Sequence, residues 1–222
     1  MPKLLAGVNA GWAECELTQY SAFEEMRDEL EALRELGTVH AVILRGRGFR
    51  SPDAIITESE CRWLELFELP TVFVFDGDLA GAALQVALSS DIRVCGRAAS
   101  FRLPIGSRRS LQLIGAASSA DLLAVRGRVN AEQALAVGAV SHIAESPEAA
   151  ISEARRLATV IASRGPIAVR LAKEAIWRGL EQPLAQALRF ETDLTLLLQT
   201  TKDRGEGVHA FLEKRQPNFT GE

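Results

Sequence analysis

The sequence has little of what disulfide frameworks, metal clusters and membrane spans require. Its 222 residues hold three cysteines and three histidines. Cys15, Cys61 and Cys95 are odd in number and widely spaced, which excludes a disulfide framework or a zinc cluster and indicates packing residues. The longest apolar runs, such as residues 69–75, are far shorter than the roughly 18–20 residues that cross a bilayer. The first residues also lack a long apolar stretch ending at a cleavage site, so we expect a soluble cytoplasmic protein.

An excess of basic charge is also missing. Lys and Arg number 25 against 29 Asp and Glu, which gives a formal net charge of -4, and no basic stripe is present. Because such stripes hold the phosphates of nucleic acids, DNA and RNA are excluded as expected partners. No internal repeat or low-complexity segment is visible. A chain of this length with 47% hydrophobic residues suits one compact globular core.

The first half of the sequence alternates between helical and strand patterns. Between residues 21 and 36, apolar residues recur at steps of three and four with charged residues between them, as an amphipathic helix requires. Short apolar runs at 39–44 and 71–75 indicate buried strands. This alternation predicts an α/β core with parallel strands. The other elements expected here are helices at 58–69 and 80–88, a strand at 91–94 and a possible strand at 101–104.

The second half is mostly helical, and Asn130 is placed as the N-cap of one of its helices. We therefore divide the chain into an α/β core at 1–140 and a C-terminal helical region at 141–222. The expected helices are 116–126, 130–138, 148–163, 167–179, 183–200 and 203–215. The helix at 183–200 carries a regular stripe that needs the α/β core or another subunit as its partner. The stripe consists of Leu184, Leu188, Glu191, Leu194 and Leu198.

Four blocks of the sequence occur in the order typical of one family. They are residues 70–104, 126–134, 138–140 and 201–219, the last with Asp-Arg, Glu-Gly, Ala-Phe-Leu-Glu-Lys-Arg and a closing Pro-x-Phe. On these residues the chain resembles the crotonase (enoyl-CoA hydratase/isomerase) superfamily. The resemblance implies a ββα spiral core, a C-terminal helical region that trimerises, and a homotrimer or hexamer. It also implies an acyl-CoA thioester as ligand with no other cofactor, and the lyase or isomerase chemistry of fatty acid metabolism.

The family's chemistry depends on two backbone N–H groups that hold the thioester oxygen and stabilise negative charge on it. One donor lies in a G-G-G stretch at a helix start, and the resemblance assigns this position to Ala82, whose methyl group narrows the approach that glycine leaves open. The other donor position falls on Asp53, after Pro52 where a glycine normally sits. Proline fixes φ and lacks an N–H, so we expect this turn to run differently. A carboxylate beside a developing oxyanion would also repel it.

The two glutamates that hydratases of this family use for proton transfer are replaced. The first position is Gln85, which can hydrogen-bond a water but cannot take its proton, and the second is Ile105, which has no acid–base chemistry. We therefore expect a non-hydratase acyl-CoA activity that uses the oxyanion hole, with Asp53 or Gln85 handling a proton or water.

Other residues are candidates for binding the substrate. Phe211 and Lys214 match tail positions that, in relatives, lie against CoA and meet its phosphate, commonly from a neighbouring subunit. Arg50 could add positive charge near an anionic ligand or lie on a solvated loop. Ala54 ends the turn that carries the second donor, and Ile105 begins a loop expected to line the acyl pocket.

Ordinary structural roles are open for several of these residues. Gln85 could be a helix residue satisfied by backbone groups, Asp53 a turn former, and His209 a surface or core histidine rather than a general base. A different class of function is also open, namely a non-catalytic accessory subunit of a CoA-dependent, polyketide-type biosynthetic enzyme. Short crotonase relatives that assist dihydroxyphenylacetyl-CoA synthesis look similar in the turn at 76–78 and in the abbreviated segment after Pro104.

Overall fold

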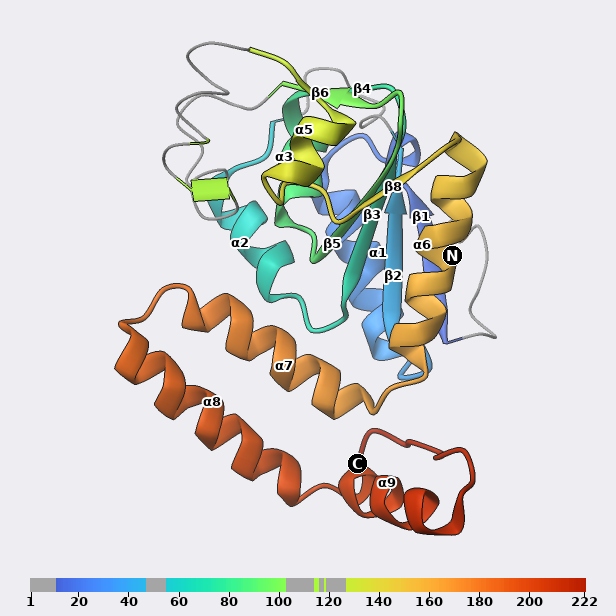
Figure 1. Cartoon of the computed structure of the whole chain (residues 1–222), viewed down its shortest axis with the longest axis vertical. Coiled ribbons are helices and arrows are strands. Elements are labelled where there is room, and N and C mark those ends of the chain that lie inside the picture. Colours follow the sequence, from blue (N-terminus) through green and yellow to red (C-terminus); the bar gives the residue numbers. More distant parts are fainter. Residues whose placement is uncertain (1–10, 47–54, 103–113, 116–117, 119–126) are drawn as a thin grey trace.

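A five-stranded sheet forms the centre of the molecule (Figure 1). The computed structural model describes residues 11–46, 55–102, 114–115, 118 and 127–222, so the predicted site residues Arg50, Asp53, Ala54 and Ile105 lie outside the described ranges. Every pairing in the sheet is parallel. Its strands lie in the order β1 (Trp12–Glu16), β2 (Ala41–Arg45), β3 (Thr71–Phe75), β5 (Ile92–Gly96) and β8 (His142–Ala144).

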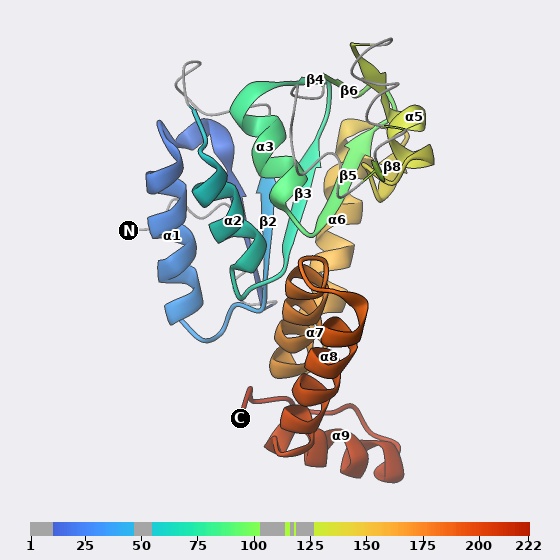
Figure 2. The same cartoon turned by 90° about the vertical axis from the view of Figure 1, so that its left-hand side faces the viewer.

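Helices cover both faces of this sheet (Figure 2). One face is covered by α1 (Phe23–Glu35), α2 (Glu58–Leu66) and α3 (Gly81–Ser89), and the other by α6 (Pro147–Ala162). The two faces form separate apolar clusters, since Leu44 and Phe73 face the first layer while Ile43 faces α6. A parallel sheet buried on both sides needs nearly continuous apolar strands, which β2 and β3 provide. The predicted α/β class is confirmed.

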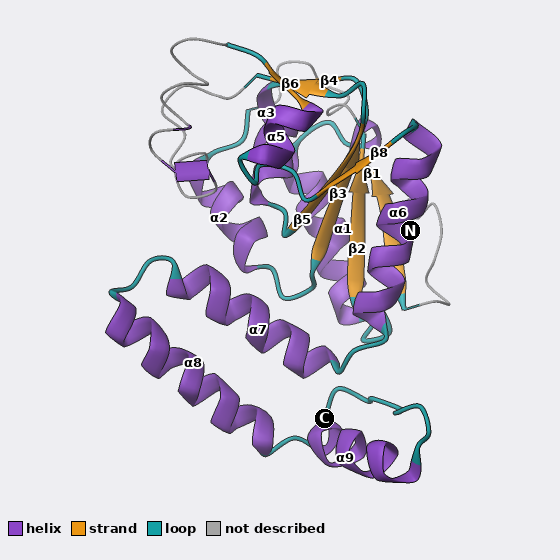
Figure 3. Ribbon diagram, viewed as in Figure 1, coloured by secondary structure: helices purple, strands orange, loops and turns teal. Residues whose placement is uncertain are grey.

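A second, small sheet lies at the carboxyl ends of the large one (Figure 3). It consists of β4 (Asp78–Leu79), β6 (Ser100–Phe101) and β7 (Val129–Asn130). The chain passes from β3 through Asp76 and Gly77 into β4, and from β4 into α3. Phe101 of β6 packs against Phe75 of β3 with ring centroids 6.5 Å apart. The small sheet therefore fixes the place where α3 begins.

Three helices extend beyond the α/β layers (Figure 1). They are α7 (Pro166–Gly179), α8 (Leu184–Gln199) and α9 (Lys202–Glu213). α8 packs on the side of α7 that faces away from the sheet, so the expected packing of its apolar stripe on the α/β core is wrong. Leu194 is buried towards α7, but Leu184 and Leu188 remain 74% and 54% exposed. Packing of these leucines on another subunit stays a prediction.

The helix bounds predicted from the sequence agree with the structure to within a few residues, apart from 116–126, which lies mostly outside the described residues. Asn130 caps α5 (Ala131–Ala136) as predicted, and its side chain accepts the Gln133 N–H at 2.9 Å. β1, β4, β7 and β8 were not predicted, and the possible strand at 101–104 is instead Ser100–Phe101. Although β8 and α6 follow residue 140, β8 pairs with β5 in the large sheet and α6 packs on one face of that sheet. The division of the chain into a core and a helical region at residue 140 stays a prediction.

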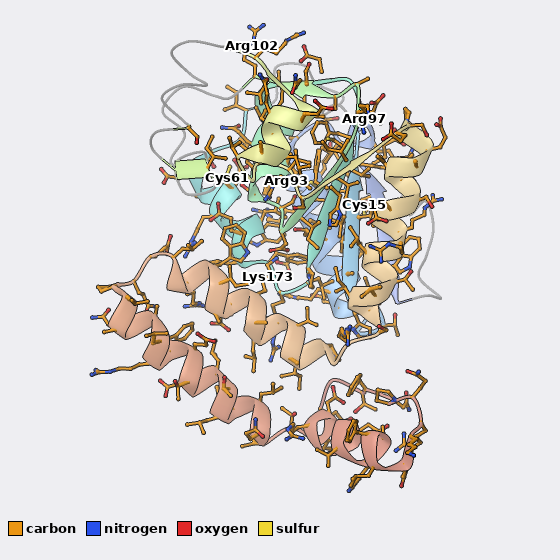
Figure 4. All side chains as sticks on the ribbon, in the orientation of Figure 1. Cys15, Cys61, Arg93, Arg97, Arg102 and Lys173 are labelled. Carbon is orange, nitrogen blue, oxygen red and sulfur yellow. The ribbon has the colours of Figure 1, made fainter. Side chains whose placement is uncertain are left out.

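Asp91 attaches α7 to the sheet. Its carboxylate accepts hydrogen bonds from Lys173 Nζ and Trp177 Nε1 of α7, both at 2.7 Å. It also accepts the N–H and the hydroxyl of Thr71, at the start of β3, at 2.7 and 2.9 Å. Burial lowers the pKa of the Lys173 ammonium, and the Asp91 carboxylate opposes this shift. Figure 4 shows Lys173 at the junction of α7 with the α/β layers. One carboxylate thus joins β3, β5 and α7.

Candidate active site

The N-terminus of α3 has no side-chain cap among the residues that the structure describes. Ala80 is the N-cap and makes no side-chain capping bond, and the first turn contains no acidic side chain. The first N–H groups of a helix have no partner within the helix, and they lie at the positive end of its dipole. Gly81 has φ +57, a left-handed conformation that turns the chain sharply from β4 into the helix. The half-buried Ala82 therefore presents its N–H where an oxygen carrying negative charge would be stabilised.

The packing of α3 holds this turn in place. Its buried side chains are small or aliphatic, and α2 packs against it. At the entrance, Asp78 of β4 accepts a hydrogen bond from Ser100 Oγ of β6 at 3.1 Å and forms an ion pair with Arg128, which precedes β7. One carboxylate therefore links β4 to β6 and to the residue before β7. Only Leu79 and Ala80 separate Asp78 from the start of α3.

Gln85 lies on the same side of α3 as Ala82, three residues further along the helix. Side chains on a helix lean towards its N-terminus, so the Gln85 amide lies over the first turn. The side chain is half-buried. Among the described residues no backbone group forms a hydrogen bond with its amide, which is the bond that the purely structural alternative requires. An amide can donate to and accept from a water or a substrate oxygen, but it does not transfer protons at neutral pH.

The structure does not bring all predicted site residues together. Phe211 and Lys214 belong to the end of α9, which lies at the opposite end of the molecule from β4 and the start of α3 (Figures 1 and 2). Both side chains are exposed, Phe211 by 82%. The fold of one chain therefore does not bring them next to Ala82, and the predicted contact from a neighbouring subunit stays a prediction. His209 is exposed, as expected for a surface histidine.

Cys15 and Cys95 are not candidates for nucleophilic chemistry. Cys15 and Cys95 are buried in the core cluster, and Cys61 packs against it, so the prediction that they are packing residues is confirmed. Burial raises the pKa of the Cys95 thiol to about 11 and that of the Cys15 thiol to about 12. Both thiols are protonated at neutral pH, whereas the thiolate is the reactive form.

One buried polar cluster is not among the predicted site residues. Glu14 of β1 is fully buried on the α6 side, where it accepts hydrogen bonds from Arg45 Nη1 at 2.7 Å and Arg155 Nε at 2.9 Å. Arg45 also lines a pocket of about 340 Å³ with Glu16 and Asp76, between the carboxyl ends of β1–β3 and α6. Local sequence carries no signal for this cluster, because its members are 31 and 141 residues apart from Glu14.

The chain is similar to known proteins in both sequence and fold. Residues 53–222 match the family described as enoyl-CoA hydratase/isomerase. "Enoyl-CoA hydratase domain-containing protein 2, mitochondrial" of Bos taurus is 32% identical, over 98% of this chain and 87% of its own length. "Probable enoyl-CoA hydratase 2, mitochondrial" of Arabidopsis thaliana is 34% identical over 72% of this chain, which spans 56% of that relative. The crystal structure of an enoyl-CoA hydratase from Bacillus anthracis superposes with a TM-score of 0.83, at 26% identity, over 96% of each chain.

Proposed function

The chain belongs to the enoyl-CoA hydratase/isomerase family, and from this we propose that it binds an acyl-CoA thioester with the thioester carbonyl at the start of α3. The observation that carries the proposal is the first turn of α3, where the N-cap Ala80 makes no side-chain capping bond and the Ala82 N–H has no partner among the described residues. A fixed N–H dipole stabilises an enolate or tetrahedral oxyanion without reorganising during the reaction. We assign the second donor to the Asp53 N–H, by resemblance to the family.

The proposed activity is an acyl-CoA reaction other than hydration. Hydration needs one group that takes a proton from water and one that gives a proton to carbon. Gln85 can orient a water over the first turn of α3 but cannot deprotonate it, and Ile105 can do neither. The chemistry that remains is charge stabilisation on the thioester oxygen, with Gln85 or Asp53 assisting by hydrogen bonding.

Calorimetry of the full chain with butyryl-CoA, followed by a spectrophotometric assay with crotonyl-CoA, tests this function. We expect saturable binding of butyryl-CoA and no measurable hydration of crotonyl-CoA. If the chain binds none of several CoA thioesters, the proposed acyl-CoA binding is wrong. Hydration at about 1 s⁻¹ or faster, the range of ordinary enzymes, would show that the missing glutamates are not needed.

Substitutions of Ala82 separate its N–H from its side chain. In Ala82→Pro the N–H is lost, and proline is tolerated in the first turn of a helix. We expect about tenfold weaker binding of butyryl-CoA, in line with the loss of one hydrogen bond to a charged or polarised oxygen. Ala82→Gly keeps the N–H and removes the methyl group, so its affinity is expected to equal or exceed that of the unchanged chain. Equal affinities for all three proteins, with matching far-UV circular dichroism, would exclude Ala82 as the donor.

A non-catalytic accessory role remains the second candidate. It is favoured by Gln85, which occupies the reacting end of α3 without a group that transfers protons. Co-purification with a polyketide-type synthase, and no change in any acyl-CoA when the chain is alone, would support it over a catalytic role. We propose a homotrimer or hexamer in either case, because α7–α9 expose several large apolar side chains, among them Leu184, Phe211 and Leu212.

A cytoplasmic location is also a proposal. In the described ranges, none of the helices combines the length and the apolar character needed to cross a bilayer. Two of the relatives above carry "mitochondrial" in their names.

A further inference from the structure

The segment after α9 folds back along the helix and covers one of its faces. The Asp203 carboxylate accepts the N–H groups of Thr220 and Gly221 at 2.8 and 3.0 Å. Glu206, one turn further, accepts the Asn218 N–H at 2.7 Å. These bonds run antiparallel to α9, and Asp203 itself is buried beneath them. We name residues 214–222 the return segment.

Arg215 closes the return segment at the C-terminal end of α9. Its Nη1 and Nη2 bind the two oxygens of Glu206 at 2.6 and 2.9 Å, and its Nε binds Glu213 at 2.6 Å. The hydrogen bonds from Arg215 and from the Asn218 N–H hold the pKa of Glu206 at about 2, so this carboxylate stays charged at neutral pH. Two parallel N–H bonds from one guanidinium fix orientation as well as distance.

The residue next to Arg215 has an unusual backbone. Lys214 is the C-cap of α9 with φ 56 and ψ 35, and within the described ranges it is the one residue other than glycine with positive φ. A left-handed conformation is disfavoured for a residue with a Cβ. The Arg215 N–H reaches back to the Ala210 carbonyl at 3.0 Å, and the Arg215 side chain is clamped on Glu206. These contacts hold Lys214 in the conformation that it would not adopt alone.

The opposite face of α9 remains open. The covered face carries Asp203, Glu206 and Ala210, whereas Phe211 and Leu212 on the open face are 82% and 71% exposed. Phe211 lies in the last turn of α9 and Lys214 is its C-cap, so an aromatic ring and an ammonium group belong to the same helix end. A ring beside a cation suits a ligand that carries an aromatic base and phosphates.

We propose that Glu206 and Arg215 are positioning residues, which hold Phe211 and Lys214 in the geometry that binds the nucleotide end of the CoA ligand. This inference rests on the proposed acyl-CoA function. The two parallel bonds of this pair fix the orientation of the helix end, which is what a positioning role requires.

The test compares two ligands that differ only in the nucleotide. Calorimetry measures the affinity of the full chain for butyryl-CoA and for butyryl-pantetheine, which lacks the nucleotide. In Glu206→Gln we expect about tenfold weaker binding of butyryl-CoA and unchanged binding of butyryl-pantetheine. Arg215→Lys should give the same selective loss, because lysine cannot make the two parallel bonds. Glu153→Gln is the matched control, since Glu153 binds Arg156 Nε and Nη2, both at 2.8 Å, on the distant helix α6.

The other outcomes are distinct. Equal affinity of Glu206→Gln and the unchanged chain for butyryl-CoA overturns the positioning role. An equal loss for both ligands also overturns it, because it shows a general effect on the fold. If the unchanged chain binds both ligands equally well, the nucleotide is not held by α9, and the proposed function survives without this inference. If it binds neither ligand, the proposed function fails first.

Discussion

Asp91→Ala is expected to lower the free energy of unfolding by about 3–5 kcal/mol, the usual result of removing one partner from a buried ion pair. The substitution leaves the Lys173 ammonium, 7% exposed, without its carboxylate partner. It also removes the acceptor of the Trp177 indole N–H and of the Thr71 N–H. For a chain of this size the midpoint of thermal unfolding should fall by about 10 °C.

The free energy of unfolding is measured by urea unfolding followed by tryptophan fluorescence. The Trp177 indole lies at this attachment point and donates to Asp91, so its fluorescence reports the unfolding of this region. Glu174→Ala is the control: its partner Arg178 is half-exposed on the same helix, and we expect a loss below about 1 kcal/mol. Lys173→Met should cost less than Asp91→Ala, since Asp91 keeps the donors of Thr71 and Trp177. A loss below 1 kcal/mol for Asp91→Ala would contradict the assignment of this carboxylate as the attachment point of α7.

The helices were predictable because their signals are local. In α1, apolar residues recur with the period of the helix, and in α5 the cap residue Asn130 stands directly before the first turn. The strands β2 and β3 were predictable because a sheet buried on both faces needs continuous apolar runs. In each case the information lies within a few neighbouring residues.

β1 was missed because its sequence contains charged residues at alternate positions. Glu14 would exclude a buried strand by local reasoning, and in the structure it is fully buried. Arg45 and Arg155 compensate its charge, and both come from distant parts of the chain. The same holds for Asp91, whose partners Lys173 and Trp177 are 82 and 86 residues away. Long-range charge pairs leave no local pattern in a single sequence.

The candidate site was predictable only in part, for a related reason. Family motifs locate Ala82 and Gln85 on α3, and the structure adds that the first turn there is uncapped. The same motifs locate Phe211 and Lys214, but the fold places them at the far end of one chain. The proposed contact of Phe211 and Lys214 with a ligand at Ala82 therefore depends on the proposed oligomer, which the fold of a single chain does not reveal.

The double variant Gln85→Glu/Ile105→Glu is expected to hydrate crotonyl-CoA at a rate at least about 10²-fold above the upper limit measured for the unchanged chain. A positioned proton donor or acceptor contributes about 10²–10⁴-fold to such a reaction, and the double variant supplies both. Glutamate has the size of glutamine, and the Gln85 amide makes no hydrogen bond within the described ranges that the substitution would break. The rate is measured as loss of the conjugated thioester absorbance.

Two matched variants show whether proton transfer is the cause of the increase. Gln85→Glu/Ile105→Gln provides the first carboxylate and only an amide at the second position, so its rate should stay well below that of the double glutamate. Gln85→Leu removes hydrogen bonding from α3 without adding a proton acceptor, and it should not hydrate crotonyl-CoA. If the double glutamate binds butyryl-CoA normally and still fails to hydrate, the thioester does not lie within reach of both positions. The loss of hydration would then originate in the geometry of the oxyanion hole rather than in the replaced glutamates.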